Sequence, residues 1–329
     1  MPDNPLIESA IKYRLRLDKQ SAADINRLIN AYTQLAARLM DKQDLLLAEL
    51  GSGEWTIAQV RKMSRYQTLI ASITDELNRY NQYLGVELNR IANEAVSQSI
   101  LDYRQLINYA GAGIVTSFNA VPNNAIKTLL GFLAPDSPLF QRLNELAPLL
   151  AQSIGDLILE GVGLGYNPFK VGQMITNQLG WGLSNAMRWA RTTQMWTYRE
   201  ASRATMAANA NILDGWIWFA IMDAAVPPCE SCLSNHGKLF PVSEPLDDHW
   251  NGRCVALPHV AGDDNPVTQS GEEWFDKLTE DQQRGIMGVG KLQAYKDGLF
   301  DFSQLTQQVK DDVFGTMRTE VSLKSLLGE

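Results

Sequence analysis

The first 110 residues carry apolar side chains at the spacing of a helix face. Between residues 25 and 39, apolar residues recur every three or four positions, which places them on one stripe of a helix. This pattern predicts a long helix that ends at Gly51-Ser-Gly53. Ser21 and Asp24 precede the stripe and are expected to form an N-terminal cap pair.

A second long helix is predicted behind another cap pair, Thr56 and Gln59. Gly85 is expected to end this helix, and the apolar spacing from Leu88 to Ile100 predicts a third. Long paired helices with a polar back are typical of a helical bundle scaffold. A helical arm that docks on a partner is the alternative, and the pattern does not separate the two.

The middle of the chain is punctuated by glycine and proline. Residues 111–136 are expected to form a connector with one short helix near 125–133. Pro138 suits the first position of a following helix, which Pro148 is expected to interrupt or kink. A further helix is predicted to end near Gly180.

Residues 183–210 are predicted to form a helix with a basic face. At about 100° per residue, four arginines fall within roughly 120° of one another and form a stripe. Such a stripe suits DNA phosphate, an acidic protein partner, or an ordinary solvated or salt-bridged surface. Its members are Arg188, Arg191, Arg199 and Arg203.

Short runs of strand-forming residues follow this helix at 216–222, 238–241 and 255–257. Beyond a polar linker, residues 271–329 are expected to form short helices that wrap onto this protein or a neighbour. The whole pattern predicts a mainly α protein with a small β portion, of the α+β class.

Three regions are expected along the chain. Residues 1–110 form the N-terminal long-helix region, and residues 111–260 form a central helical domain that ends in a small sheet. Residues 261–329 form the linker and a helical C-terminal tail.

Composition narrows the class of protein. Apolar residues make up 45% of the 329-residue chain, which is enough for a packed core. The net charge of −8 argues against a sequence-blind nucleic-acid coat, because such proteins are basic overall. The longest dense apolar run, Trp216–Met222, is too short to span a membrane, and no signal peptide is expected. A soluble protein made in a cytoplasm is therefore expected.

All cysteines and histidines of the chain lie between residues 229 and 259. A Cys-x2-Cys turn supplies two thiolates, and a histidine and a cysteine further along can supply two more ligands. This combination suits Zn²⁺, which binds sulfur and imidazole nitrogen in closed tetrahedral structural sites. The candidate ligands are Cys229, Cys232, His249 and Cys254.

Other interpretations of this cluster stay open. The thiols are unrelated in one of them, and in another Cys229 and Cys232 form a disulfide that leaves Cys254 unpaired. Four candidate ligands favour a closed structural site over a catalytic one, which keeps a coordination position open. His236 and His259 are expected to be surface residues outside the ligand set.

A series of motifs between residues 190 and 254 resembles the head-morphogenesis proteins of tailed phages. These minor head proteins include the phage Mu F-like group, and the resemblance covers about residues 137–260. The motifs are Ala190-Arg191-Thr192 on a helix, Asn209, Gly215 before an aromatic strand, Cys229-x2-Cys232, His236-Gly237-Lys238-Leu239-Phe240, and His249-x-Asn251-x-Arg253-Cys254.

Two residues depart from the family pattern. Trp250 replaces the family proline, and Gly252 stands where the family often has the first cysteine of Cys-Arg-Cys. A finger held by packing alone, without a metal, is therefore an alternative. The segment that begins at Gly271-Glu-Glu-Trp-Phe and continues through Gln282-Gln283-Arg284 to Tyr295 also looks like tails of such proteins.

The resemblance implies a structural, non-enzymatic role in head assembly and in DNA packaging or delivery. Family members are minor virion components, present in few copies, inside the head or at the portal vertex. The implied partners are the portal protein and/or the major capsid protein, with phage DNA as a further candidate and no membrane.

Two other functions compete with this one. Asp248-His249, Asn251 and His259 loosely resemble the constellation of HNH-like nucleases, in which a histidine activates water beside a metal. Their spacing is compressed, and that role would take His249 away from the zinc. A DNA-binding module is the second alternative, and steep salt dependence of DNA affinity would be its mark.

Overall fold

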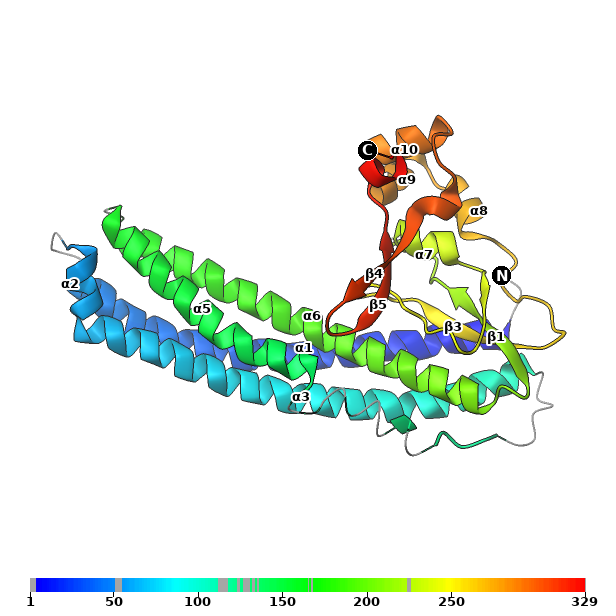
Figure 1. The fold of residues 1–329 in the computed structure, drawn as a ribbon, viewed down its shortest axis with the longest axis horizontal. Helices are drawn as coiled ribbons and strands as arrows, with labels where there is room; N and C mark the ends of the chain where they lie inside the picture. The colour runs from blue at the N-terminus through cyan, green and yellow to red at the C-terminus, as the bar shows by residue number, and fades with distance from the viewer. Residues whose placement is uncertain are drawn as a thin grey trace. The chain divides into compact units, whose positions relative to one another are not determined.

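The computed structural model is mainly helical with small antiparallel sheets, which confirms the predicted fold class (Figure 1). It describes residues 4–50, 55–111, 118–122, 125–126, 131, 134, 136–164, 166, 168–223 and 226–328. Most of the short helix expected near 125–133 falls outside these residues. Within them, none of the helices combines the length and apolar character needed to cross a bilayer.

The chain divides into two compact units, and each is assembled from separate stretches of sequence. Unit 1 contains residues 1–19, 92–130 and 192–329, and unit 2 contains residues 20–91 and 131–191. These units cut across the three consecutive regions expected from the sequence. The reason is that three long helices each contribute residues to both units.

Five helices account for most of the chain ahead of the sheet. They are α1 (Pro5–Leu50), α2 (Ile57–Lys62), α3 (Ser64–Ala110), α5 (Pro138–Gly163) and α6 (Pro168–Ala208). Helix α1 is described up to Leu50, and the predicted stop at Gly51-Ser-Gly53 lies outside the described residues. Thr56 with Gln59 forms the predicted capping box, although α2 that follows is short.

Ser21 and Asp24 do not cap a helix, because α1 already begins at Pro5 and runs through them. Asp24 is instead buried in unit 2, where it forms ion pairs with Arg27 and Arg90. One of the two residues that resemble a cap pair in the sequence is therefore a buried carboxylate that forms ion pairs.

The helix breaks expected at Gly85 and Gly180 are also absent, since α3 and α6 continue through them. At Gly85 an added Cβ would lie 2.7 Å from Cε1 of Phe140 in α5. Glycine at this position allows two helices of unit 2 to pack closely and does not end either of them.

A three-stranded antiparallel sheet forms the centre of unit 1. Its strands are β1 (Leu213–Phe219), β2 (Leu239–Phe240) and β3 (Val255–Val260), in the order β2-β1-β3. Trp216, Trp218 and Phe219 of β1 are almost fully buried, which explains why this strand carries so many large apolar residues. β1 begins three residues before the predicted strand at 216–222.

The C-terminal region folds back onto unit 1. Its helices include α8 (Gly271–Asp276), α9 (Glu280–Met287), α10 (Val289–Lys296) and α11 (Leu323–Leu326), as the sequence led us to expect. The expectation missed the antiparallel hairpin β4 (Thr306–Asp311) and β5 (Gly315–Glu320). Ser231 and Asn235 of α7 (Glu230–Asn235) both contact the hydroxyl of Thr306 at the start of that hairpin.

Helix α8 packs so closely on α7 that its first residue has to be glycine. An added Cβ at Gly271 would lie 2.0 Å from the backbone oxygen of Leu233. Phe275 of α8 is fully buried in the cluster formed with Leu233 and Phe302. The tail is therefore a packed part of unit 1.

We predict that Gly271→Ala destabilises the protein by about 1–3 kcal/mol, because a new methyl group must push backbone apart. Gly285→Ala in α9 is the matched control, since a Cβ there meets nothing within 4 Å. This control should gain up to about 1 kcal/mol from helix propensity. Urea denaturation measures both, and equal free energies of unfolding for the two variants would contradict the prediction.

Candidate metal centre

The candidate ligands come from two short segments of unit 1. Cys229 is the N-cap of α7, where its sulfur accepts a hydrogen bond from the backbone N–H of Cys232 at 3.4 Å. His249 and Cys254 lie in the loop between β2 and β3, and Cys254 directly precedes β3. The start of α7 and the loop that leads into β3 therefore hold the candidate ligands.

The side chains of these residues converge. Nε2 of His249 lies 3.0 Å from Sγ of Cys229 and 3.6 Å from Sγ of Cys232. Cys229, Cys232 and His249 form one group whose ligand atoms all lie within 4.8 Å, and Cys232, Asp248 and Cys254 form another. The cluster of three cysteines and His249 can therefore bind a metal ion.

A cavity of about 190 Å³ adjoins the cluster and is lined by all four candidate ligands. Cys232 and Cys254 are buried, whereas Cys229 is half-buried and the side chain of His249 is 27% exposed. The cavity therefore borders two buried and two partly exposed candidate ligands. All three cysteines are free thiols, so the structure does not contain the disulfide considered above.

Asp248 holds the ligand loop in place, and its side chain is fully buried. One carboxylate oxygen accepts hydrogen bonds from the Arg199 guanidinium at 2.7 Å and from the backbone N–H of Cys254 at 3.1 Å. The other accepts from the backbone N–H of His249 at 2.9 Å and from the thiol of Cys232 at 3.4 Å. One carboxylate therefore touches three of the four candidate ligands.

Hydrogen bonds and nearby charges shift the pKa values of two candidate ligands, Cys229 and His249. The hydrogen bond with Cys232 lowers the pKa of the Cys229 thiol to about 6 against the effect of burial, and His249 adds to the lowering. Burial alone would lower the pKa of His249, but its hydrogen bond to Cys229 and the charge of Asp248 raise it to about 10. These directions favour a thiolate at Cys229 beside a protonated His249, and a divalent cation that binds here would displace that proton.

Gly252 is explained by the same carboxylate. A Cβ at this position would lie 2.2 Å from Oδ2 of Asp248, so the cysteine of the family pattern does not fit here. Asn251 beside it has a positive φ of 59°, a conformation that asparagine tolerates better than most residues. Its backbone N–H donates to Oγ1 of Thr192 at 3.4 Å.

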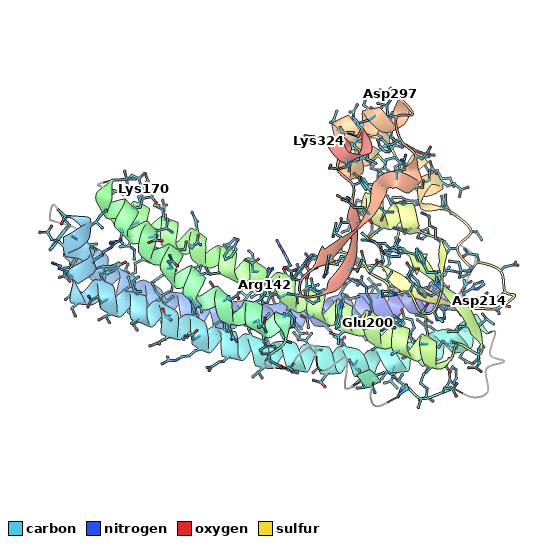
Figure 2. All side chains as sticks on the ribbon, viewed as in Figure 1. Arg142, Lys170, Glu200, Asp214, Asp297 and Lys324 are labelled. Atoms are coloured by element: carbon cyan, nitrogen blue, oxygen red, sulfur yellow. The ribbon has the colours of Figure 1, made fainter. Side chains whose placement is uncertain are left out.

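His236 and His259 lie outside the ligand set, but they are buried and the expectation that they are surface residues was wrong. Nδ1 of His236 accepts a hydrogen bond from the backbone N–H of Ala220 at 3.0 Å, and burial lowers the pKa of this histidine to about 4. His259 on β3 contacts Asp214 at 2.7 Å and the backbone oxygen of Asp263 at 3.0 Å (Asp214 is labelled in Figure 2).

The four arginines of the predicted stripe have different environments. Arg188 and Arg191 are exposed, in unit 2. Arg199 is buried in unit 1 and paired with Asp248, so it is not part of an exposed basic surface. Arg203 is half-buried and pairs with Glu200 at 2.8 Å (Glu200 is labelled in Figure 2). Periodicity located the arginines on one helix but did not show which of them meets a carboxylate.

Trp250, which replaces the family proline, anchors the C-terminal hairpin to the ligand loop. Its Nε1 donates to Asp311 at 3.1 Å, and its ring meets that of Phe314 edge to face at 4.9 Å. Arg318 of β5 forms an ion pair with Asp247 at 2.6 Å. Sequence reasoning missed these contacts, because the hairpin has no apolar alternation that would indicate a strand.

Comparison with protein-family models, with curated proteins and with solved structures finds no match to this chain. The family resemblance stated above is therefore neither supported nor opposed by these comparisons.

We predict that Gly252→Cys weakens metal binding, although it restores the cysteine of the family pattern. The new Cβ must displace the carboxylate of Asp248, and a displaced Asp248 no longer orients Cys254 and His249. Gly252→Ala introduces the same clash without a sulfur and should have a similar effect. Metal affinity is measured by chelator competition, and tighter binding by Gly252→Cys would show that the glycine is not required.

We further predict that Asp248→Asn costs about 3–5 kcal/mol of folding free energy, because it leaves the buried Arg199 without a charged partner. Glu200→Gln is the matched control on the same helix, since its ion pair with Arg203 is partly exposed and is expected to contribute under about 1 kcal/mol. Guanidinium denaturation measures the free energy of unfolding of both variants. An Asp248→Asn loss as small as the control would contradict the assigned role.

Proposed function

We propose that Cys229, Cys232, His249 and Cys254 bind a structural Zn²⁺. A set of three thiolates and one imidazole suits zinc, which has no geometric preference of its own and accepts sulfur and nitrogen ligands. Support comes from two overlapping groups that share Cys232, one with Cys229 and His249 and the other with Asp248 and Cys254, and from the burial of two of the three thiols. Four protein ligands fill a tetrahedral site and favour a structural role.

A metal at this position would stabilise a small fold. The sheet has three strands, and β2 contains two residues. Sheets of this size need additional packing or cross-links to be stable. A zinc ion that joins α7 to the strand end at Cys254 contributes binding free energy directly to folding.

We predict that the full-length protein, purified without chelator, contains one zinc ion per chain. Cys232→Ser should lose the zinc and lower the melting temperature by about 10 °C, since a ligand at 1,000 times its Kd contributes about 4 kcal/mol. EDTA should lower the melting temperature of the wild-type protein to a similar value. Elemental analysis and thermal denaturation measure both effects, and zinc-free wild-type protein with an unchanged response to EDTA would exclude the centre.

For the chain as a whole, we propose a structural minor head protein of a tailed phage, which binds the portal and/or the major capsid protein and aids head assembly and DNA packaging or delivery. The supporting observation is that the motif residues contact one another. Thr192 of the Ala-Arg-Thr motif accepts from Asn251 of the final motif, and Gly215 lets β1 approach β2, since a Cβ there would lie 2.4 Å from the Phe240 oxygen.

The tail motif supports the same proposal. Gly271 and Phe275 pack against α7, which carries the Cys-x2-Cys turn. Tyr295 donates a hydrogen bond to Glu272 at 2.7 Å, and the side chain of Gln283 donates to the backbone oxygen of Phe275 at 3.0 Å. Motifs that are distant in the sequence thus build one scaffold. Their roles are in packing and metal binding, which favours an assembly component over an enzyme.

The histidine geometry weighs against the nuclease alternative. His249 directs Nε2 to two thiols, and its Nδ1 lies 2.8 Å from the backbone oxygen of Trp250. Both ring nitrogens are engaged, so His249 is not positioned to activate water. Phage DNA remains a candidate partner through the exposed Arg188 and Arg191.

Co-expression with the portal and major capsid proteins of the same phage tests the proposed role. We predict that the full-length chain co-purifies with assembled particles on a gradient and is present inside the head or at the portal vertex. Arg188→Glu with Arg191→Glu should reduce its incorporation, if these exposed arginines meet an acidic partner or DNA.

Lys12→Glu with Lys19→Glu, which reverses two exposed charges on α1, controls for the change in net charge. Its incorporation should equal that of the wild-type protein. Absence of the wild-type chain from purified particles would remove the assembly role. Equal incorporation of both double variants would leave that role in place and remove the arginines from it.

A further inference from the structure

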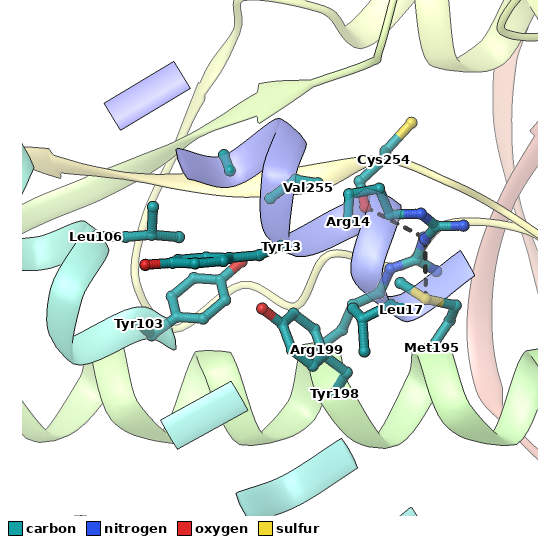
Figure 3. Close-up of a pocket in the computed structure, with 11 residues that line it drawn as sticks. Tyr13, Arg14, Leu17, Tyr103, Leu106, Met195, Tyr198, Arg199, Cys254 and Val255 are labelled. Carbon is teal, nitrogen blue, oxygen red and sulfur yellow. Dashed lines mark hydrogen bonds between the residues drawn. The ribbon is translucent and has the colours of Figure 1, made fainter. Parts of the chain in front are cut away.

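Two buried arginines lie together beside the candidate metal centre, and one of them comes from the first helix of the chain. Arg14 of α1 is 4% exposed and Arg199 of α6 is 7% exposed. Both line a small cavity of about 10 Å³ together with Cys254 (Figure 3). Burying two guanidinium groups side by side is unfavourable unless negative charge lies near them.

Arg14 reaches the ligand loop directly. One terminal nitrogen donates to the backbone oxygen of Gly252 at 3.3 Å and contacts the sulfur of Met195 at 2.8 Å. The other terminal nitrogen and Nε donate to the two carboxylate oxygens of Asp18 in the same helix, at 2.8 Å and 3.3 Å, and the side chain of Asp18 is 43% exposed. Solvent therefore screens the charge of Asp18, which leaves Arg14 only partly compensated.

Arg199 is also incompletely compensated. It pairs with Asp248 and donates to the backbone oxygen of Cys254 at 3.3 Å, but its Nε has no hydrogen-bond partner among the described residues. Among the buried charged groups described here, Arg14 and Arg199 contribute two positive charges and Asp248 contributes one negative charge. Asp18, which is partly exposed, offsets only part of the positive charge that remains.

A three-thiolate metal centre supplies the missing negative charge. A divalent cation contributes +2 and three thiolates contribute −3, so the centre carries −1 when its histidine is neutral. This charge offsets the part of the positive charge of the two arginines that Asp248 and the partly exposed Asp18 leave uncompensated. Arg14 and Arg199 also donate hydrogen bonds to the ligand loop, and donors outside the coordination sphere orient the ligands of a metal.

We propose that Arg14 belongs to the outer sphere of the metal centre and, with Arg199, offsets its negative charge, so that metal binding and the docking of the N-terminal residues 5–19 in unit 1 are coupled. This inference rests on the proposed metal centre. Arg14 is a positioning residue, since it contacts the backbone of the ligand loop and no candidate ligand side chain. Because the coupling is reciprocal, a metal-loaded centre holds the N-terminal segment more tightly, and a docked segment holds the metal more tightly.

Zinc affinity of full-length variants, measured by competition with a chromophoric chelator, tests the proposal. Arg14→Met removes the charge and retains an apolar stem, and it should weaken zinc binding about 10- to 100-fold. Arg14→Lys restores the charge and should recover a large part of that loss. Lys12→Met is the matched control two residues earlier on α1, because Lys12 is exposed and its replacement is expected to change the affinity less than about 3-fold.

Hydrogen exchange provides an independent readout on the wild-type protein. Zinc should slow amide exchange in residues 5–19, and removal of zinc with EDTA should accelerate it, whereas Arg14→Met should abolish this response. Two results would overturn this inference alone. One is an unaltered zinc affinity in Arg14→Met, and the other is amide exchange in residues 5–19 that does not change when the wild-type protein binds zinc. Wild-type protein that binds no zinc would overturn the proposed centre and this inference together.

Discussion

The buried carboxylate of Asp248 is the interaction on which the candidate site depends. A carboxylate without solvent is stable where charged and polar donors surround it, and Asp248 has Arg199 and two backbone N–H groups. Burial raises its pKa, but Arg199 and then His249 outweigh that effect, and the net pKa is lowered. An ionised Asp248 at neutral pH fixes the loop from which His249 and Cys254 project, and it excludes any side chain at position 252.

The sequence was most informative where the signal is local. Cysteines and histidines are rare in this chain, so their clustering between residues 229 and 259 indicated a site directly. The structure brings Cys229, Cys232 and His249 together as that pattern predicts, and it places Cys254 beside Cys232 through a second group. Long amphipathic helices were also predictable, because their periodicity extends over many turns.

Contacts between distant segments could not be predicted in this way. Nothing near Asp248 in the sequence indicates Arg14, which lies more than 230 residues away from the loop it contacts. Glycine was the most ambiguous signal, since Gly85 and Gly252 have the residue type of a break but serve close contacts with Phe140 and Asp248. The hairpin β4–β5 was missed because most of β4 is polar and exposed, and because Arg318, Trp250 and Phe314 attach it to the rest of unit 1.

The interleaved composition of unit 1 has a consequence for how the chain folds during synthesis. Residues 5–19 leave the ribosome first, but their packing partners in the sheet and the ligand loop follow more than 190 residues later. Unit 2 can form its contacts in the meantime. The first turns of α1 can pack on Tyr103 and Leu106 of α3, but their apolar face stays incompletely buried until the strands are made. Unit 1 therefore closes late through contacts of large sequence separation, which are slow to form. Its first helix is exposed to chaperones or to association with other chains during that interval.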